Sequence, residues 1–241
     1  DIPGTTRDTL DTPLRYKNKN YLIIDTAGIR KKSKIKQKLE GLCIIKSLQA
    51  IERADITLLV IDAKEFVSDQ DKKLASIVIE QYKPLILIVN KWDLILNKTS
   101  QSTTHFENSL RSALTPFDYI PIIFVSCLKN QRISKIMPTV EKMSQQYLSR
   151  VNTSEVNKAL EKIIHEHNPA LSKTTSKQIK FYYATQIKSA PPTIIVKCNL
   201  ADELHDSYKK YMVNKFRSYL GFKDIPIKVL FSNKGYNRKN I

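Results

Sequence analysis

LILIVNKWD, residues 85–93, is the stretch that decides the fold. Its opening run is almost continuously apolar, a pattern typical of a β-strand buried on both faces, and polar residues follow at once. Three further runs have the same character: YLIID (21–25), TLLVID (57–62) and IPIIFV (120–125). Apolar residues at helical spacing lie between or after these runs. The alternation predicts an α/β fold, a doubly wound and mostly parallel sheet with helices on both faces.

The polar residues after residues 85–89 fit the chemistry of a guanine base. The Asp93 carboxylate offers two acceptor oxygens, which match the adjacent N1 and N2 donors of guanine, whereas adenine lacks this donor pair. Asn90 can tie neighbouring loops together, and the stem of Lys91 can lie over base and sugar. A polar turn that merely follows a strand is the competing interpretation of Asn90–Asp93.

DTAG, Asp25–Gly28, follows the first of the four runs directly. Ligands of a doubly wound sheet sit at the carboxyl ends of its strands, where an Asp can hold Mg²⁺ through water beside a phosphate chain. Gly28 lets a backbone N–H approach a terminal phosphate, which a Cβ would obstruct. A loop with an N-cap Asp would look the same when taken alone.

SCL, Ser126–Leu128, follows the fourth run, and the small side chain of Cys127 would let backbone N–H groups reach guanine O6. DTAG, NKWD and SCL therefore follow strands at one edge of the same predicted sheet. Their order predicts a guanine-nucleotide fold. The predicted GTP-binding residues are Asp25, Thr26, Ala27, Gly28, Ile29, Asn90, Lys91, Trp92, Asp93, Ser126, Cys127 and Leu128.

The opening segment GTTRD, residues 4–8, resembles switch I of translation-factor-type GTPases. One hydroxyl, Thr6 rather than Thr5, is expected to ligate Mg²⁺ when a γ-phosphate is present, with Asp25 acting indirectly. Alternatively, either threonine caps a turn. Ile29 stands where many signalling GTPases place a water-orienting Gln, so hydrolysis would need a monovalent cation or a group from a partner.

The chain contains no phosphate-binding loop of the form G-x-x-x-x-G-K-[ST]. Its five glycines include no pair at that spacing. We therefore expect the first strand, loop and helix of the nucleotide domain to precede Asp1. As a fragment without that loop, the chain alone is expected to bind GTP weakly or not at all, with no useful turnover.

Bulk composition favours a polyanionic partner. The 241 residues carry a formal net charge of +17, as expected of proteins that bind nucleic acid or an anionic surface. No apolar run approaches the roughly 18 residues that a membrane span needs. Three separated cysteines suit the reducing cytoplasm better than a disulfide framework, and with the histidines they form no zinc spacing.

The pattern loosens near 149–155, which predicts one domain over 1–150 and a second over 151–241. The second reads as helix (155–167), strands (180–186 and 193–199), helix (204–220) and strand (225–231), a small α+β unit. It has 16 Lys and Arg against 7 Asp and Glu, whereas residues 1–150 have 24 against 16. His165 and His167 are expected to be solvated.

Two basic regions are candidates for RNA phosphates. RKKSKIKQK (30–38) is either a solvated loop or a nucleotide-sensitive switch that touches RNA. The smaller domain would bind by charge, or would pack on the nucleotide domains without reading sequence. The candidate residues are Arg30, Lys31, Lys32, Lys209, Lys210, Lys215 and Arg217.

Five segments together resemble the Der (EngA) family, bacterial GTPases with two tandem G domains and a KH-like tail. They are DIPGTTRDTLDTP (1–13), IIDTAGIRKK (23–32), VNKWD (89–93), KFYYATQ with PPTIIVKCN (180–199), and FRSYLGFKDIPIKV (216–229). The resemblance covers almost the whole chain and implies the second G domain without its P-loop, followed by the KH-like domain. Family members commonly have Ala at the position of Cys127.

The resemblance implies GTP and GDP as ligands, Mg²⁺, and a role in assembling the large ribosomal subunit through its rRNA. It also implies a missing first G domain in the same full-length chain, with a monomeric, cytoplasmic protein and no membrane. A KH fold that clamps RNA with G-x-x-G is excluded because no two glycines are three apart. This also excludes Era-like GTPases. GTPases of the tRNA-modification type lack such an α+β tail. A non-enzymatic rRNA- or ribosome-binding module that has lost nucleotide binding is the alternative.

Overall fold

The computed structural model describes residues 11–24, 48–95, 100–172, 174 and 176–233. The chain divides into two compact units, residues 1–57 and 58–241. The predictions for residues 1–10 and 25–47, which include Thr6, DTAG, Ile29 and the basic RKK loop, lie outside the described residues.

The described part of the first unit contains a β-hairpin. Strands β1 (Asp11–Tyr16) and β2 (Lys19–Ile24) pair antiparallel. Lys17 and Asn18 both adopt positive φ, 46° and 61°, as a two-residue hairpin turn requires. The expectation that residues 21–25 form a strand buried on both faces is wrong for the described residues, because Leu22 is 58% exposed. The local turn pairs β2 with its neighbour in sequence, and β1 was not predicted.

A three-stranded sheet begins the second unit, in the order β3 (Thr57–Asp62), β4 (Leu85–Asn90), β5 (Ile122–Phe124). Strands β4 and β5 are parallel, as predicted. The first five residues of β4 are all buried, since a strand lies on each side of it. Leu58 and Val60 of β3 are instead 43% and 49% exposed, so the prediction of burial on both faces is wrong for this outer strand.

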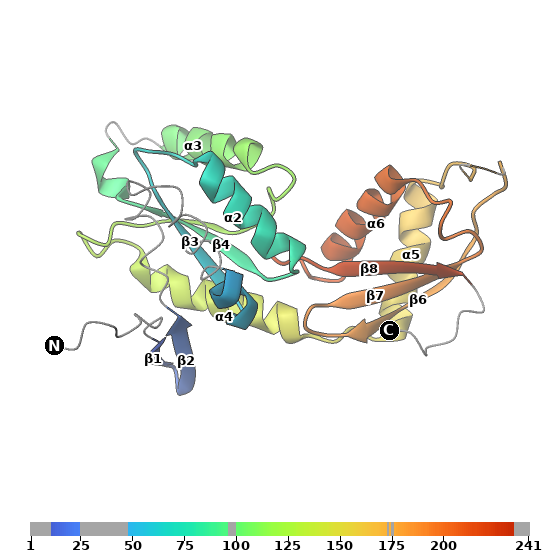
Figure 1. The fold of residues 1–241 in the computed structure, drawn as a ribbon, viewed down its shortest axis with the longest axis horizontal. Coiled ribbons are helices and arrows are strands. Elements are labelled where there is room, and N and C mark those ends of the chain that lie inside the picture. Colours follow the sequence, from blue (N-terminus) through green and yellow to red (C-terminus); the bar gives the residue numbers. More distant parts are fainter. Residues whose placement is uncertain (1–10, 25–47, 96–99, 173, 175, 234–241) are drawn as a thin grey trace, which may run out of the picture. The chain divides into compact units, whose positions relative to one another are not determined.

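Helices cover this sheet on both sides, with α2 and α3 on one and α4 on the other (Figure 1). They span α2 (Asp69–Glu80), α3 (Ser100–Ala113) and α4 (Ile136–Leu148), with short 3₁₀ turns at Trp92–Leu94 and Ile133–Lys135. Helix α2 starts with a capping box, in which Ser68 Oγ accepts from Asp71 N–H at 3.2 Å and Ser68 N–H donates to the Asp71 carboxylate at 2.9 Å. Pro138 lies in the first turn of α4, where a missing N–H costs nothing.

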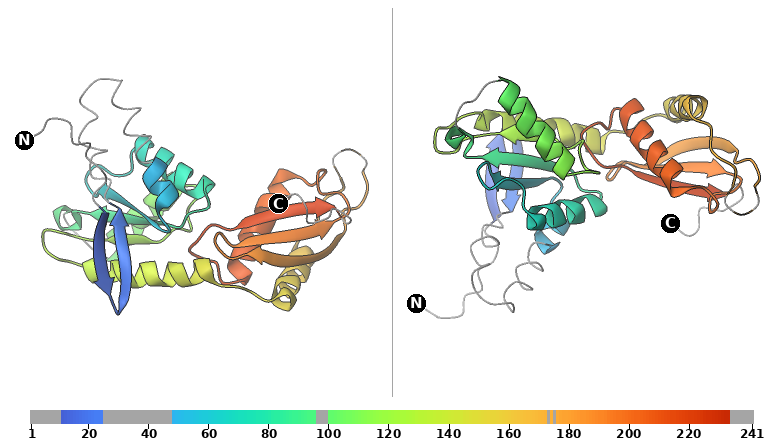
Figure 2. Two further views of the ribbon diagram at one scale, coloured as in Figure 1. Left: turned by 60° about the horizontal axis from the view of Figure 1, so that its bottom comes forward. Right: turned by 90° about the horizontal axis from the view of Figure 1, so that it is seen from above.

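The remainder of the second unit is an α+β arrangement in the predicted order. Its elements are α5 (Thr153–Glu166), β6 (Phe181–Lys188), β7 (Thr193–Cys198), α6 (Asp206–Tyr219) and β8 (Lys228–Asn233). The sheet order is β6-β7-β8, antiparallel then parallel, with α5 and α6 against one face (Figure 2). Strand β8 begins three residues later than predicted, after Pro226, which has no N–H to donate. The predicted fold class, a GTPase-type sheet followed by a KH-like α+β unit, is confirmed.

Two polar side chains, Asn157 and Gln186, form hydrogen bonds with backbone groups at and near strand β6. Asn157 of α5 bonds both backbone groups of Ala184, donating to its carbonyl at 3.0 Å and accepting from its N–H at 2.9 Å. The buried Gln186 side chain accepts from Val151 N–H at 2.7 Å and donates to Ser149 O at 3.1 Å. Asn157 therefore occupies the edge of the strand, and Gln186 fixes the connection between α4 and α5.

Among the described residues, no helix is both long enough and apolar enough to cross a membrane.

Candidate functional site

The carboxyl end of β4 is held to both neighbouring strand ends by backbone hydrogen bonds. Ala63 N–H, just after β3, donates to Asn90 O at 2.9 Å, and Trp92 N–H donates to Val125 O at 3.0 Å. Lys91 between them has φ 60° and ψ 31°, a left-handed conformation that turns the chain sharply out of the strand. The loops after β3, β4 and β5 therefore meet at one edge of the sheet, where doubly wound folds bind ligands.

Asn90 ties the loop after β5 to β4. Its Oδ1 accepts from the backbone N–H of Cys127 at 3.1 Å. Ser126, which is fully buried, supports the same loop, because its Oγ accepts from Lys129 N–H at 3.1 Å. The tight turn leaves the Leu128 side chain 88% exposed at its tip. The structure thus brings the NKWD and SCL segments together through Asn90.

Lys91 forms an ion pair that the sequence analysis did not identify. Its Nζ lies 2.6 Å from Oδ2 of Asp62, the last residue of β3. The hydrogen bond that Lys91 donates to the Asp62 carboxylate raises the pKa of the Lys91 ammonium above its ordinary value, so this group is charged at neutral pH. Asp62 Oδ1 also accepts from Lys64 N–H at 2.9 Å, which fixes the carboxylate. The signal available in the sequence was an Asp that ends an apolar run, as Asp25 does.

Trp92 and Asp93 lie in the 3₁₀ turn after Lys91. The Trp92 ring is buried, 4.4 Å from the Phe124 ring and 5.2 Å from the Phe106 ring between centroids. Trp92 therefore belongs to the core, and its contribution to a ligand site would be through the backbone. Asp93 is partly exposed on the same turn.

The four cations predicted in the smaller domain have different surroundings. Lys215 pairs with Glu166 at 2.6 Å, and the Arg217 guanidinium lies 3.4 Å from the centroid of the Tyr119 ring. Burial lowers the pKa of Arg217 below its ordinary value, which marks this side chain as packed. Lys209 pairs weakly with its helix neighbour Asp206 at 3.3 Å, and Lys210 is exposed. Lys210 is thus the most accessible of the four, whereas the side chains of Lys209 and Lys215 are 33% and 36% exposed.

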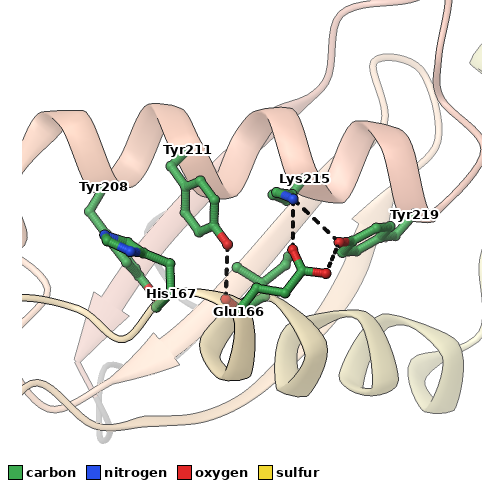
Figure 3. Close-up of polar contacts among 7 residues, drawn as sticks. Glu166, His167, Tyr208, Tyr211, Lys215 and Tyr219 are labelled. Carbon is green, nitrogen blue, oxygen red and sulfur yellow. Dashed lines mark hydrogen bonds and ion pairs between the residues drawn. The ribbon is translucent and has the colours of Figure 1, made fainter.

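A cleft of about 610 Å³ lies between the end of α5 and the first half of α6 (Figure 3). Two tyrosine hydroxyls of α6 donate to the last carbonyls of α5, from Tyr208 to His167 O at 2.7 Å and from Tyr211 to Ile163 O at 3.1 Å. Burial raises the pKa of Tyr208 to about 12. The first bond supplies a donor to the carbonyl of the C-cap residue His167, and the second adds a donor to Ile163 O, which also accepts from His167 N–H at 3.2 Å.

Glu166 is the acidic centre of the cleft. Hydrogen bonds from Lys215 and from the Tyr219 hydroxyl lower the pKa of its carboxyl group (Figure 3). The same contact raises the pKa of Lys215. The Lys162 ammonium lies 4.2 Å from the centroid of the Tyr219 ring. Glu166 therefore stays ionised and compensated at neutral pH.

The sequence relatives decide which family this architecture represents. Residues 1–91 match a model described as a 50S ribosome-binding GTPase, and residues 150–232 match the KH-domain-like C-terminal domain of EngA bacterial GTPases. The GTPase Der of Fusobacterium nucleatum is 42% identical over 234 residues, 97% of this chain and 53% of that protein. The chain belongs to the Der (EngA) family. The GTPase Der of Geotalea daltonii is 41% identical over 96% of this chain.

The chain spans about half the length of these Der relatives. Among solved structures, Era with MgGDPNP and a segment of 16S ribosomal RNA is 17% identical, with TM-score 0.47 over 96% of this chain and 82% of that one. Elongation factor SelB of Methanococcus maripaludis is 16% identical, with TM-score 0.44 over 76% and 34%. Both likenesses are weak, and the assignment to the Der family stands on the sequence relatives. The domain boundary near residue 150 stays a prediction.

The described residues at the β4 edge include the predicted guanine-site residues but no cluster of metal ligands. Asn90 Oδ1 and the N–H of Cys127 meet there at 3.1 Å, and Asp93 lies in the adjacent turn. In the part of the chain that the structure describes, no group of three His, Cys, Asp or Glu residues could hold a metal ion. The predicted Mg²⁺ residues, Thr6 and Asp25, lie outside the described residues.

Proposed function

We propose that this chain is part of a GTP-binding and GTP-hydrolysing factor that acts in biogenesis of the large ribosomal subunit. The observation that carries the proposal is the joining of three strand-end loops at one edge, through Asn90 Oδ1 and Cys127 N–H at 3.1 Å and Ala63 N–H and Asn90 O at 2.9 Å. Membership in the Der family supports the same activity.

Guanine selection rests on the turn after β4. Asp93 accepts from N1 and N2 of the base, and the stem of Lys91 covers one face of it. Asn90 holds the loop of Ser126, Cys127 and Leu128 against this edge, where backbone N–H groups read guanine O6. Preformed loops of this kind bind tightly because little ordering is needed when the ligand arrives.

The phosphate end of the nucleotide is assigned to residues 25–29 and to Thr6. Asp25 and Thr6 would hold Mg²⁺, which neutralises phosphate charge, and Gly28 would sense the γ-phosphate through its backbone. Ile29 cannot orient water, so a monovalent cation or a partner's group would assist hydrolysis. The β-phosphate cradle would come from a G-x-x-x-x-G-K-[ST] loop upstream of this chain, within a protein that also carries a first G domain.

The proposed partner is the rRNA of the large subunit or its precursor, met in the cytoplasm by a monomer. The net charge of +9 over residues 151–241 supports this assignment. Lys209 and Lys210 are the foremost phosphate contacts, with Arg30, Lys31 and Lys32 as a second group. Lys215 and Arg217 would contribute after release from Glu166 and Tyr119.

Asp93→Asn tests the guanine assignment in the full-length protein. Asn offers one acceptor and one donor edge, which matches xanthine, a base with a carbonyl in place of the guanine amino group. We expect GDP affinity to fall by at least tenfold while XDP affinity rises, measured by isothermal titration. Asp202→Asn, at an exposed acid of the KH-like unit, is the matched control. Equal GDP affinity in both variants would refute the assignment.

A non-enzymatic ribosome- or RNA-binding module is the second candidate, favoured by the lack of a G-x-x-x-x-G-K-[ST] motif in these 241 residues. Reading the coding DNA upstream of Asp1 separates the two. An upstream phosphate loop preceded by another G domain supports the GTPase. A start codon immediately upstream of the Asp1 codon, with no phosphate loop, would leave a basic binding module that keeps the guanine-site residues without using them.

A further inference from the structure

Three aromatic rings of the KH-like unit form a column that ends at the surface. Phe181 and Tyr208 are nearly parallel, with centroids 6.0 Å apart and 16° between their planes. Tyr208 and His167 continue the stack at 5.8 Å and 28°. His167 is exposed, so the column ends in a solvent-facing imidazole beside the α5–α6 cleft. A planar ring placed against His167 would extend the column by one member.

The other lining of the cleft suits an anion next to that ring. His205 and Ser207 lie at the start of α6, where the His205 side chain makes no capping hydrogen bond and Asp206 places one acid in the first turn. Backbone N–H groups at such an end attract anions. Lys209 pairs with Asp206 at 3.3 Å and offsets this acid, and Lys210, next on the same helix, adds positive charge.

Glu166 does not make the cleft negatively charged. Its carboxylate is compensated by Lys215 at 2.6 Å and by the Tyr219 hydroxyl. Tyr211 adds an edge-on ring 5.4 Å from His167, which narrows the cleft on one side. The cleft therefore presents an aromatic surface with neutral to positive surroundings.

We infer that the α5–α6 cleft binds one nucleotide of a single-stranded RNA, with the base stacked on His167 and its phosphate at the start of α6. This rests on the proposed rRNA partner and gives it a binding site that needs no G-x-x-G clamp. Stacking on an aromatic side chain is tolerant of base identity, so the site holds RNA without reading its sequence. An acidic protein segment would use the charge but leave the exposed ring without a planar partner.

The test is the affinity of the 241-residue chain for a fluorescein-labelled oligouridine of about 12 nucleotides, followed by anisotropy. His167→Ala should weaken binding roughly tenfold, the value of one base stack, with an unchanged slope of affinity against salt. His167→Tyr should bind as the parent does. His105→Ala removes an equally exposed histidine of α3 and should change nothing. The carbonyl of residue 167, which accepts from Tyr208, is present in every variant.

The complementary variant, Lys209→Ala with Lys210→Ala, should weaken binding and flatten the salt slope by about two phosphate contacts. Polyglutamate should displace the RNA poorly. Equal affinity for the parent and His167→Ala, equal weakness for His167→Tyr and His167→Ala, or full displacement by polyglutamate would each overturn the inference. Circular dichroism of each variant confirms that it is folded.

The full-length Asp93→Asn variant separates this inference from the guanine assignment. RNA binding without nucleotide should be the same in that variant and in its parent, and His167→Ala should weaken both. Unchanged GDP affinity in Asp93→Asn, together with an intact His167 effect, contradicts only the guanine assignment. Reduced GDP affinity in Asp93→Asn, together with no effect of His167→Ala on RNA binding, contradicts only the RNA site.

Discussion

Strands β4 and β6 differ in where their polar side chains lie and in what those side chains bind. Strand β4 is buried through its first five residues and carries polar function only past its end, at Asn90 and Lys91. Strand β6 carries a buried polar residue, Gln186, within its length, and its outer edge is occupied by Asn157. In β4 packing is apolar and the open end is available to a ligand. In β6 the side chains of Gln186 and Asn157 are hydrogen-bonded to backbone groups of the same chain, so their role is structural.

Leu87→Ala tests the apolar half of this comparison and should have the largest effect. Leu87 is fully buried in β4, so the variant leaves a cavity and should lower the free energy of unfolding by about 3–4 kcal/mol. Leu58→Ala, on the half-exposed β3, should cost less than about 1 kcal/mol. Urea unfolding followed by circular dichroism measures both. Equal losses would mean that β3 is as buried in solution as β4.

Gln186→Ala tests the polar half. It removes the partners of Val151 N–H and Ser149 O within a buried site, so we expect a loss of about 2 kcal/mol. Gln186→Leu keeps the volume but leaves the same groups unpaired, and should also destabilise. Gln101→Ala, on the exposed surface of α3, is the control. If Gln186→Leu is as stable as the parent, water replaces the side chain as partner of Val151 N–H and Ser149 O, and the site is open to solvent.

Asn157→Ala should have a smaller effect of about 1 kcal/mol. The two bonds to Ala184 are lost, but a strand edge can exchange them for water. The variant should also expose an unpaired edge, which favours association between chains. Chemical unfolding gives the first effect and sedimentation velocity the second. Asn108→Ala, exposed on α3, is the control and should change neither stability nor association. If Asn157→Ala is as stable as the parent and stays monomeric, Asn157 does not protect the edge of β6.

Glu166→Gln should have the smallest effect, and it should depend on pH. Because hydrogen bonds from Lys215 and Tyr219 lower the pKa of this carboxyl below its ordinary 4.5, its stabilising contribution is present above that value. The contribution is lost as the pH falls through the lowered pKa of the folded state. Thermal unfolding at several pH values should show a gap between parent and Glu166→Gln at pH 7 that closes in acid. A gap that persists below pH 3 would exclude the ion pair as its source, and Glu161→Gln is the exposed control.

The sequence was a good guide wherever a regular pattern repeats. Apolar runs located β3 to β8 to within a few residues, and the sequence pattern located α5 and α6. Strand β1 and helices α2 and α3 were not predicted, although Ser68 and Asp71 form a capping-box pattern that signals the start of α2. The burial of Leu22, Leu58 and Val60 was predicted wrongly, because burial depends on which strands lie alongside, and an apolar run does not carry that information.

The candidate sites divide in the same way. Asn90, Lys91 and Asp93 could be found from the sequence because consecutive residues after a strand share one edge. The ion pair of Lys91 with Asp62 joins residues 29 apart, and the column from Phe181 through Tyr208 to His167 joins three separate elements. His165 and His167 looked alike as exposed helix-end residues, and contact with Tyr208 distinguishes His167.

The sequence by itself determined the order of elements, the family and the guanine-type loops, because these depend on local periodicity and on residues close together in the chain. The tertiary structure decided which charges are compensated, which polar groups are sealed and which aromatic ring remains open to a ligand. Those properties depend on through-space distances of a few ångströms between elements, such as the 2.6 Å from Lys215 to Glu166. These distances are set when the elements pack together, and they cannot be read from the separation of the residues along the chain.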